Sequence, residues 1–404
     1  MNSITKKILI IHPEGNIKNN PNLYYFTKEL VNNGFEVIVF SHHKPKIYQG
    51  ELFPGAEFVI YTDDKSYNLQ TRLKLFKQKF SAIIGVDDGI IDAAQFAKIL
   101  NVPYSFLSYE LFFDYELEKI NDPYYTKVKI KSRLACQNID FAIVQDDVRK
   151  EILSKEYKID KDKILLMPVA ASGIRKLDKS FYFHERLYIP KEKSILLYMG
   201  WMDEILLNRI IKYTQYMPEN WVLVVHSRYK YQGEIPKDFP KDKIYFSLDS
   251  PIENIDDLGI LLSACDAGFC SYQASFDSPF TGDNITFIGM SSGKTTTFLQ
   301  YGIPVIVENM NMWDQIVEKE NIGFELKNLS DLSKLDSLKQ DSIKENCFKY
   351  FEEKLDLTNY SPFIIDKLND VKSNSRISIF AFLQFVIIEN LKILKLKLTK
   401  TKAG

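Results

Sequence analysis

Cysteine is scarce in this sequence, and the spacings that would make it a metal ligand are missing. The 404 residues include four cysteines, Cys136, Cys265, Cys270 and Cys347, and no two of them form a C-x-x-C pair. No group of histidines lies near them, which argues against the usual zinc sites. We therefore predict reduced thiols in the core, no metal site and no bound cofactor.

The sequence also lacks an excess of charge and any long apolar run. Lys and Arg number 52 against 53 Asp and Glu, which gives a net charge of -1, so the chain as a whole has no electrostatic footprint for nucleic acid. No stretch reaches the roughly 18–20 uninterrupted apolar residues of a membrane-spanning helix. The first residues have no small-residue cleavage site. These absences predict a cytoplasmic protein that binds no nucleic acid.

Short β runs alternate with helical stretches along the chain. Lys7–His12 and Ala82–Val86 are typical strands of the first half, and the pattern restarts at Ser194–Gly200 after a polar stretch, Ser172–Lys193. Domains commonly have about 100–200 residues, so this length fits two of them. The alternation predicts an α/β protein with two doubly wound, Rossmann-like domains.

The predicted domain bounds follow from this pattern. Residues 1–172 form the first domain and residues 190–345 the second, while residues 346–404 form helices that pack back on the first domain. Ligands of doubly wound sheets bind beyond the carboxyl ends of the strands. We therefore expect the functional site in a central cleft between two facing sheets.

The segment Asn284–Val307 has the pattern of a phosphate site. It runs through Gly289-Met-Ser-Ser-Gly-Lys-Thr into a predicted helix, Ser292–Tyr301. Ser291 and Ser292 are good N-caps, and the N–H groups of a helix N-terminus bind phosphate. Gly293 allows close approach to the backbone, and Lys294 adds a full charge. The run Thr295–Thr297 forms helix poorly, so we expect at least one of its hydroxyls to serve the site.

A P-loop is the competing interpretation of this segment. Gly293-Lys294-Thr295 fits the end of a Walker A motif, but the position five residues before Gly293 is Ile288 and not glycine. The loop is therefore one residue short of the ring of amides that surrounds a β-phosphate.

The same region resembles the GT-B glycosyltransferases, especially the retaining enzymes of family 4 and related bacterial polysaccharide transferases. Those proteins often carry S-x-K-x-x-E-Y-x-x-x-G-x-P-V-I. The positions that match here are Ser292, Lys294, Gly302, Pro304, Val305 and Ile306. Asp266 resembles an acidic residue of the family that precedes a strand, and Tyr198-Met-Gly200 resembles the first strand and glycine of the donor domain.

The resemblance implies a GT-B fold and a metal-independent, retaining transferase in polysaccharide biosynthesis. It would move a sugar, expected from a UDP-sugar donor, to a glycan or lipid-linked acceptor. Lys294 and Arg228 would neutralise the leaving phosphates and stabilise charge as the glycosidic bond breaks. The second domain would bind the donor, through Gly200, Asn284, Ser291, Ser292, Gly293, Thr295 and Thr297.

The first domain would then hold the acceptor. Glu110 follows an apolar strand, where a carboxylate can orient an acceptor hydroxyl or act as a base. Asp88 lies at the carboxyl end of another strand, and Gly15 and Asn16 lie in the first βα loop, so we place all three on the acceptor side.

The sequence departs from the family at several positions. Thr297 stands where the family often has a glutamate, the first position of its two-glutamate spacing falls on Gly289, and Glu110 and Asp114 occupy the stretch that often holds a histidine. These departures leave open a non-catalytic subunit of GT-B type that binds nucleotide or glycan.

The C-terminal tail combines apolar residues with lysines. The run Ile377–Ile388 is followed by Lys392, Lys395, Lys397, Lys400 and Lys402. Such a pattern can lie on the inner face of an anionic membrane through residues 377–402. The alternative is a helix that packs back on the first domain with a basic, solvated end.

Overall fold

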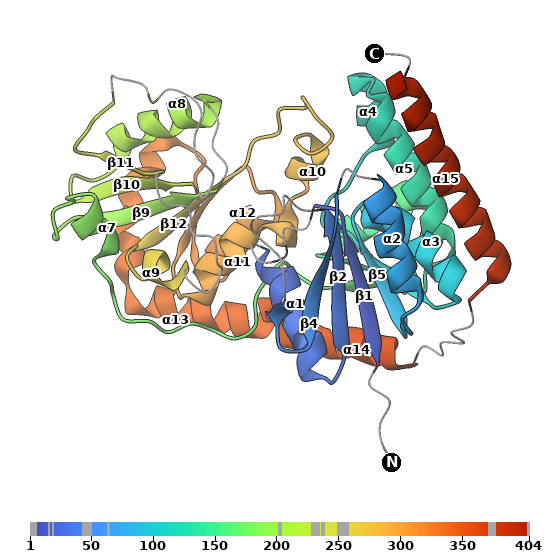
Figure 1. The fold of residues 1–404 in the computed structure, drawn as a ribbon. Coiled ribbons are helices and arrows are strands. Elements are labelled where there is room, and N and C mark those ends of the chain that lie inside the picture. The colour runs from blue at the N-terminus through green and yellow to red at the C-terminus, as the bar shows by residue number, and fades with distance from the viewer. Residues whose placement is uncertain are drawn as a thin grey trace. The chain divides into compact units, whose positions relative to one another are not determined.

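The computed structural model describes residues 6–14, 17, 20–42, 51–62, 65–200, 204–227, 235, 239–248, 258–370 and 377–401. The chain forms two compact units. Unit 1 comprises Met1–Ile17, Phe26–Met167 and Tyr360–Gly404, and unit 2 comprises Lys18–Tyr25 and Pro168–Asn359. Figure 1 colours the chain from blue at the N-terminus to red at the C-terminus, so that strands of unit 1 are blue and strands of unit 2 are green and yellow.

Unit 1 is built on a mostly parallel sheet with the strand order β3-β4-β2-β1-β5-β6-β7-β8. Its strands are β1 (Lys7–His12), β2 (Glu36–His42), β3 (Glu51–Phe53), β4 (Ala56–Tyr61), β5 (Ala82–Val86), β6 (Tyr104–Leu107), β7 (Ala142–Val144) and β8 (Ile164–Leu166). The edge strand β3 pairs antiparallel with β4. The central strand β5 is buried along its whole length, as expected of a parallel strand covered on both faces.

The chain winds outward from β1 in one direction and from β5 in the other. It passes from β1 to β2 and β4, and then from β5 to β6, β7 and β8, while β1 and β5 are themselves paired in parallel. The switch point of this sheet, at which the direction of the strand order reverses, therefore lies between β1 and β5. Ligands of open α/β sheets bind beyond the carboxyl ends of the strands at such a point.

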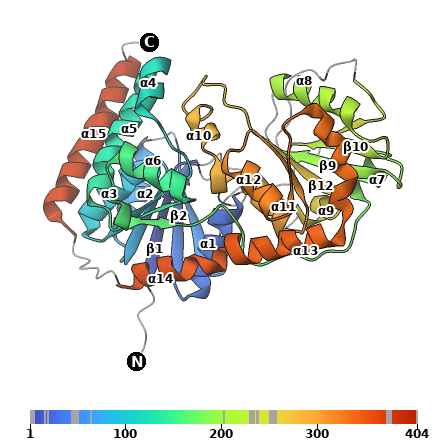
Figure 2. The same cartoon turned by 180° about the vertical axis from the view of Figure 1, so that it is seen from behind.

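The helices of unit 1 come from both ends of the sequence. They are α1 (Pro21–Asn32), whose first residues belong to unit 2, and α2 (Lys65–Phe76), α3 (Gly89–Leu100), α4 (Asp114–Ile120), α5 (Pro123–Ala135), α6 (Asp147–Tyr157), α14 (Ser361–Asp370) and α15 (Ile379–Thr401). Helix α3 packs against β1, β5 and β6, and α15 packs against α2 and α3. Figure 2 shows this last helix in red, on the same side of unit 1 as α2 and α3.

Unit 2 has a parallel sheet with the order β11-β10-β9-β12-β13-β14. Its strands are β9 (Ser194–Met199), β10 (Trp221–His226), β11 (Ile244–Ser247), β12 (Ala267–Ser271), β13 (Val305–Glu308) and β14 (Gly323–Glu325). Its helices are α7 (Tyr182–Arg186), α8 (Glu204–Tyr213), α9 (Leu258–Leu262), α10 (Asp283–Thr286), α11 (Gly293–Gln300), α12 (Met312–Lys319) and α13 (Asp341–Tyr350). The switch point lies between β9 and β12, which pair in parallel.

The bounds of the two units differ from the predicted domains in several places, and residues 168–172 are one of them, because they group with unit 2. Residues 18–25 group with unit 2, and Asn22 donates hydrogen bonds to the carbonyls of Pro168 and Ala170 at 2.9 and 3.2 Å. Residues 346–359, which include the end of α13, also group with unit 2, and α14 and α15 belong to unit 1.

The sequence of Asn284–Ile288 is typical of a strand or loop, but the structure has helical turns before Gly293. Residues Asp283–Thr286 form α10, and Gly289–Ser291 form a turn of 3-10 helix that leads into α11. Trp313, which is fully buried, donates a hydrogen bond from Nε1 to the carbonyl of Gly289 at 2.8 Å. This anchored helical turn replaces the strand that precedes a P-loop.

Candidate functional site

Helix α11 presents its N-terminus and Lys294 together. Ser292 is the N-cap, and its Oγ accepts a hydrogen bond from the backbone N–H of Thr295 at 3.4 Å. The hydroxyl of Ser292 also donates to the hydroxyl of Tyr272 at 3.2 Å. The cap predicted from the sequence is thus confirmed, and it places Lys294 in the first turn of the helix.

The ammonium of Lys294 lies between two tyrosine rings. Its nitrogen is 4.5 Å from the ring centroid of Tyr198, near the end of β9, and 4.5 Å from that of Tyr272, just after β12. These are the two strands that flank the switch point of unit 2. Lys294 therefore occupies the place where a doubly wound sheet binds its ligand.

No carboxylate pairs with Lys294 within the described part of the chain. Its surroundings lower the pKa of the ammonium to about 8, because desolvation disfavours the charged form, although the thiol of Cys270 opposes this shift. Cation–π contacts compensate only part of the lost hydration. The arrangement therefore favours an anion that would supply the missing negative charge.

Gly200 follows β9 directly and lies against Lys294. Its φ of +138° is rarely adopted by residues with a side chain, and a Cβ atom there would lie 3.4 Å from Cε and 3.5 Å from Nζ of Lys294. A glycine at this position keeps the space beside the ammonium open.

The threonines of α11 are buried, and their hydroxyls have partners inside the protein. The hydroxyl of Thr296 donates to the carbonyl of Val169 at 2.5 Å, and that of Thr297 donates to the carbonyl of Gly293 at 2.6 Å. The hydroxyl of Thr295 lies 2.8 Å from that of Ser292. These bonds fix the first turns of the helix; donor contacts from Thr295 and Thr297 stay predictions.

The other predicted donor residues lie on the segment leading into α11. Asn284 is buried in α10, and its amide lies 3.4 Å from the carbonyl of Phe280. Ser291 ends the 3-10 turn, and Gly293 begins α11, where a Cβ atom would lie 3.1 Å from Cγ1 of Val169. Their roles toward a donor are not tested by these contacts.

A polar cluster that the sequence did not reveal lies at the ends of β12 and β13. Arg209 donates to Ser271 Oγ at 2.7 Å and lies 3.4 Å from the carboxylate of Glu308. That carboxylate also accepts hydrogen bonds from Tyr213 and Ser271, both at 2.5 Å. The sequence signal was weak, because one glutamate at the end of the apolar strand V-I-V-E is also typical of a solvated strand end.

Two other polar residues of unit 2 have structural roles. Asp266 accepts the backbone N–H of Ile195 at 2.8 Å and pairs with Lys179 at 2.7 Å, so it fixes the start of β9. His226 is buried beside Ser247, and desolvation lowers its pKa to about 4.

In unit 1, acidic side chains lie at the switch point between β1 and β5. Asp87 follows β5 with a left-handed φ of 48°, and one of its carboxylate oxygens accepts the backbone N–H groups of Tyr109 and Glu110 at 2.8 and 3.0 Å. Burial, and then the charge of Glu110, raise the pKa of Asp87 well above its usual range. Asp87 thus joins the loop after β5 to the loop after β6.

Asp88 lies beside Asp87 and is half-buried. Desolvation, followed by repulsion from Glu14 and Asp92, raises its pKa to about 6. Gly89 comes next, and a Cβ atom there would lie 2.2 Å from the carbonyl oxygen of Ile11. Glycine is required because the turn after β5 approaches β1 this closely. The structure therefore brings Asp88, Asp87 and Glu110 to one end of the sheet.

Arg149 is a fully buried cation that the sequence analysis did not identify. Its guanidinium donates to Gln145 Oε1 at 2.8 Å and to the carbonyl of Tyr109 at 2.5 Å. The side chains of Glu110, Asp146 and Asp87 partly offset the desolvation that lowers its pKa. Arg149 therefore places a buried positive charge near these carboxylates.

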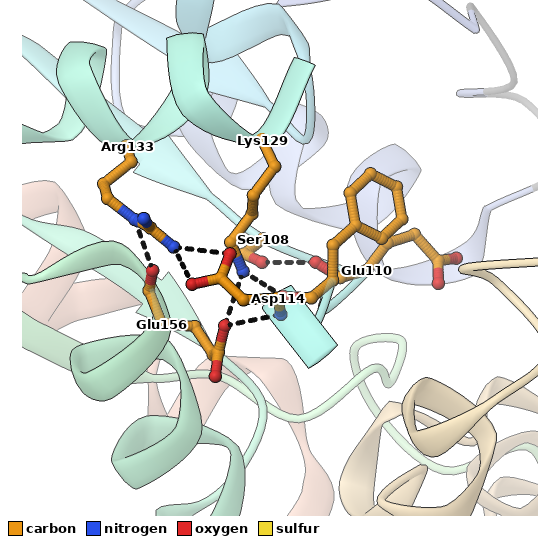
Figure 3. Close-up of polar contacts among 7 residues, drawn as sticks. Ser108, Glu110, Asp114, Lys129, Arg133 and Glu156 are labelled. Carbon is orange, nitrogen blue, oxygen red and sulfur yellow. Dashed lines mark hydrogen bonds and ion pairs between the residues drawn. The ribbon is translucent and has the colours of Figure 1, made fainter. Parts of the chain in front are cut away.

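The loop that carries Glu110 is held by an ion-pair network (Figure 3). Lys129 donates to the carbonyl of Phe112 and pairs with Glu156 at 2.9 Å, and Arg133 pairs with Asp114 at 2.5 Å. Ser108 Oγ donates to the carbonyl of Glu110 at 2.9 Å. Figure 3 shows the carboxylate of Glu110 directed away from this network, so the network fixes the loop and leaves the acid group outside it.

Three predicted site residues lie outside the described residues: Gly15, Asn16 and Arg228. Their roles stay predictions. The four cysteines are all free and buried, as predicted. Among the residues that the structure describes, no group of three or more His, Cys, Asp or Glu side chains could hold a metal ion.

A family model matches the segment that carries Lys294. Residues 289–359 match the C-terminal domain of the glucosyltransferase 3-like proteins. The match begins at Gly289, includes the whole of α11 and ends at the last residue of unit 2. No curated protein matches the chain in sequence.

Solved structures of glycosyltransferases have the same fold over nearly the whole chain. Sucrose-phosphate synthase from Thermosynechococcus elongatus matches 89% of this chain and 97% of its own, with a TM-score of 0.64 at 12% identity. HepE of Anabaena, solved with UDP and glucose, matches 90% and 99%, with 0.62 at 13%. The lipopolysaccharide glycosyltransferase WaaG matches 90% and 100%, with 0.59 at 13%.

These similarities identify the fold. The chain has two α/β units with parallel sheets, and its structural neighbours are glycosyltransferases of the GT-B type. The fold class expected from the sequence is confirmed, with one antiparallel edge strand added in unit 1.

Proposed function

We propose that this protein is a glycosyltransferase that takes a sugar from a nucleotide-sugar donor, namely a UDP-sugar, and transfers it to a glycan or lipid-linked acceptor without a metal. The observation that carries the proposal is the ammonium of Lys294 at the switch point of unit 2, which pairs with no carboxylate among the residues that the structure describes. The neighbour HepE was solved with UDP and with UDP-glucose, which supports the uridine nucleotide.

Lys294 and the start of α11 would hold the donor diphosphate. The helix N-terminus offers unpaired N–H groups, and the ammonium next to them neutralises the negative charge that develops as the glycosidic bond breaks. Arg228 would contribute a second cation. Two protein cations in place of a metal ion make the proposed transfer metal-independent.

Unit 1 would orient the acceptor. Glu110 has its carboxylate outside the ion-pair network that fixes its loop, and Asp88 has a raised pKa at the same end of the sheet. A carboxylate with a pKa near neutrality, such as that of Asp88, can accept a proton from a hydroxyl and release it again. We propose Glu110 as the group that positions the acceptor hydroxyl and retention as the stereochemical outcome, following the GT-B enzymes of family 4.

Nucleotide binding tests this function. Melting temperatures are measured with UDP, GDP, CMP and ADP, with and without Mg²⁺, for the wild type and for Lys294→Met. A ligand that binds the folded state stabilises it by RT ln(1 + [L]/Kd), so we expect UDP to raise the melting temperature without metal, and the variant to lose most of that shift.

A matched control is Lys334→Met, because Lys334 is exposed and paired with Asp331 at 2.7 Å. It should keep the full UDP shift. Stabilisation by ATP that requires Mg²⁺ would support a P-loop phosphotransferase instead. Binding of UDP without any release of sugar from UDP-glucose would support a non-catalytic subunit, and no binding of any nucleotide would refute the proposal.

A further inference from the structure

Helix α15 exposes a continuous apolar face. Phe380, Leu383, Ile387 and Leu391 are exposed to 78%, 53%, 59% and 61%. Their spacing of three and four residues places them on one side of the helix. Within the described part of the chain, this stripe has no protein element covering it, because these side chains are more than half exposed.

The opposite face of the same helix is anchored in unit 1. Ala381 and Phe385 are buried, and the ring of Phe385 packs edge-on against Phe76 of α2 at 5.2 Å between centroids. Just before the helix, the backbone N–H of Ser378 donates to the carbonyl of Ile99 in α3 at 2.8 Å. The helix is therefore docked on α2 and α3, as the packing interpretation of the tail predicted.

A helix with apolar residues on both sides is normally buried on both sides. One side of α15 meets that expectation and the other does not. Large contiguous apolar patches on a folded surface mark interaction sites. The exposed stripe on α15 therefore has the character of an interaction site.

The positive charge of the segment favours a partner with a negatively charged surface. Residues 379–404 contain five lysines and one glutamate, in a chain whose net charge is -1. The single acid, Glu389, is paired with Lys392. Lys395, Lys397 and Lys400 follow on the same helix, which continues to Thr401. An apolar protein partner would leave these charges without counter-ions, whereas the phosphates of anionic lipids would neutralise them.

We propose that the exposed face of α15, defined by Phe380, Leu383, Ile387 and Leu391, docks on the surface of an anionic membrane. The helix would lie in the interface plane with these side chains in the acyl boundary, and the positive charge of the segment would be attracted to the anionic lipids. No helix among the described residues is long and apolar enough to cross a membrane. The proposed docking is inferred from the exposed apolar face of α15 and from the charge of residues 379–404. It does not depend on the proposed sugar transfer.

Flotation with lipid vesicles tests the docking. The full chain is mixed with vesicles of phosphatidylcholine alone or of phosphatidylcholine with phosphatidylglycerol, at low and at high salt. We expect binding to the anionic vesicles to be at least about tenfold stronger than to the neutral ones, and to weaken with salt. The double variant Phe380→Glu, Ile387→Glu should lose at least about tenfold in binding, because it places charges in the apolar face.

The matched control is Phe363→Glu on α14, since Phe363 belongs to the same unit and is 69% exposed. It should bind vesicles like the wild type. A second variant, with Lys395, Lys397 and Lys400 each changed to Gln, keeps the buried residues Ala381 and Phe385 and should also lose binding to the anionic vesicles. Circular dichroism melting checks that both variants fold, and an unchanged UDP shift separates this test from the proposed transferase function.

Two results would overturn the proposal. One is equal binding of wild type and both variants to the anionic vesicles. The other comes from light scattering without lipid: if the wild type is a dimer and the double variant a monomer, then the apolar face is an interface between two copies of this chain.

Discussion

The nitrogen of Lys294 lies 4.5 Å from the ring centroid of Tyr198, although the two residues are separated by almost a hundred positions in the sequence. One lies at the start of α11 and the other near the end of β9. The aromatic ring partly replaces water around the ammonium. Within the described ranges of the chain, the charge is therefore kept at the switch point of the sheet without an acidic partner that would compete with a bound anion.

We expect Lys294→Met to stabilise the ligand-free protein while it weakens nucleotide binding. The methionine keeps an apolar chain between Tyr198 and Tyr272 and removes a charge whose hydration is incomplete. At pH 7 the melting temperature of unit 2 should rise by about 2–4 °C, which corresponds to about 1 kcal/mol for a unit of this size. The affinity for UDP, measured by calorimetry, should fall by about tenfold or more, because a charge-assisted contact is lost. A variant that is less stable and binds UDP normally would contradict the role of this lysine.

The affinity for UDP should depend on the protonation of Lys294. The pKa of its ammonium is lowered to about 8 in the free protein, first by desolvation. Because the folded-state pKa lies below the unfolded value, the charged form is disfavoured by folding at neutral pH, and an anion that binds the charged form raises the pKa again. Calorimetry between pH 7 and pH 9 should show weaker binding as the pH rises through about 8, and Lys294→Met should remove this step.

Asp88→Asn should stabilise unit 1 at neutral pH. The pKa of Asp88 is raised to about 6, so its carboxyl group contributes stability while protonated, and that contribution is lost as the pH rises from about 4 through 6. The amide avoids the buried charge near Glu14 and Asp92. We expect a gain of about 1 kcal/mol at pH 7 after solvent screening, or about 2–4 °C, and no gain near pH 4.

The control for this substitution is Asp178→Asn, at an exposed position in unit 2. Thermal melting of both variants across this pH range should show a pH-dependent difference for Asp88 alone. An equal gain at both ends of the range would show that the charge of Asp88 is not the cause.

Removing the carboxylate of Glu308 should destabilise unit 2. Glu308→Ala takes away the acceptor of the Tyr213 and Ser271 hydroxyls and leaves Arg209, only 20% exposed, without its ion-pair partner. We expect a loss of about 2 kcal/mol in urea unfolding. Glu320→Ala, which breaks a more exposed pair with Lys319, should cost about 0.5 kcal/mol or less. Similar losses for the two variants would mean that the cluster around Glu308 is held by other contacts.

The sheet strands were predictable because parallel strands covered on both faces are continuous apolar runs. The bounds of Lys7–His12 and Ala82–Val86 agree with the structure. The short antiparallel strand Glu51–Phe53 was missed, since a three-residue edge strand has too few positions to show a pattern. The helical turns at 283–291 were also missed, because buried contacts such as that of Trp313 override weak local preferences there.

The candidate site was only partly predictable, because contacts between distant segments leave no local pattern in the sequence. Ser292 and Lys294 carry a local signal, a cap followed by a basic first turn. Tyr272 and Arg149 carry none, and Tyr198 was noted only as part of a strand, because the roles of all three come from contacts between segments far apart in the sequence. An arginine in a helix that begins with two aspartates suggests a solvated surface, and only the folded chain shows Arg149 to be buried.

The path of the chain between the two units has a consequence for its synthesis. The chain leaves unit 1 after Ile17, returns at Phe26, leaves again after Met167 and returns at Tyr360. A ribosome therefore releases all of unit 2 before it releases α14 and α15, which complete unit 1. Until that moment, Phe76 lacks the rings of Phe382 and Phe385 that cover it in the finished protein. Unit 2 can close during translation, whereas unit 1 must wait with part of its apolar surface open for the last segment to emerge.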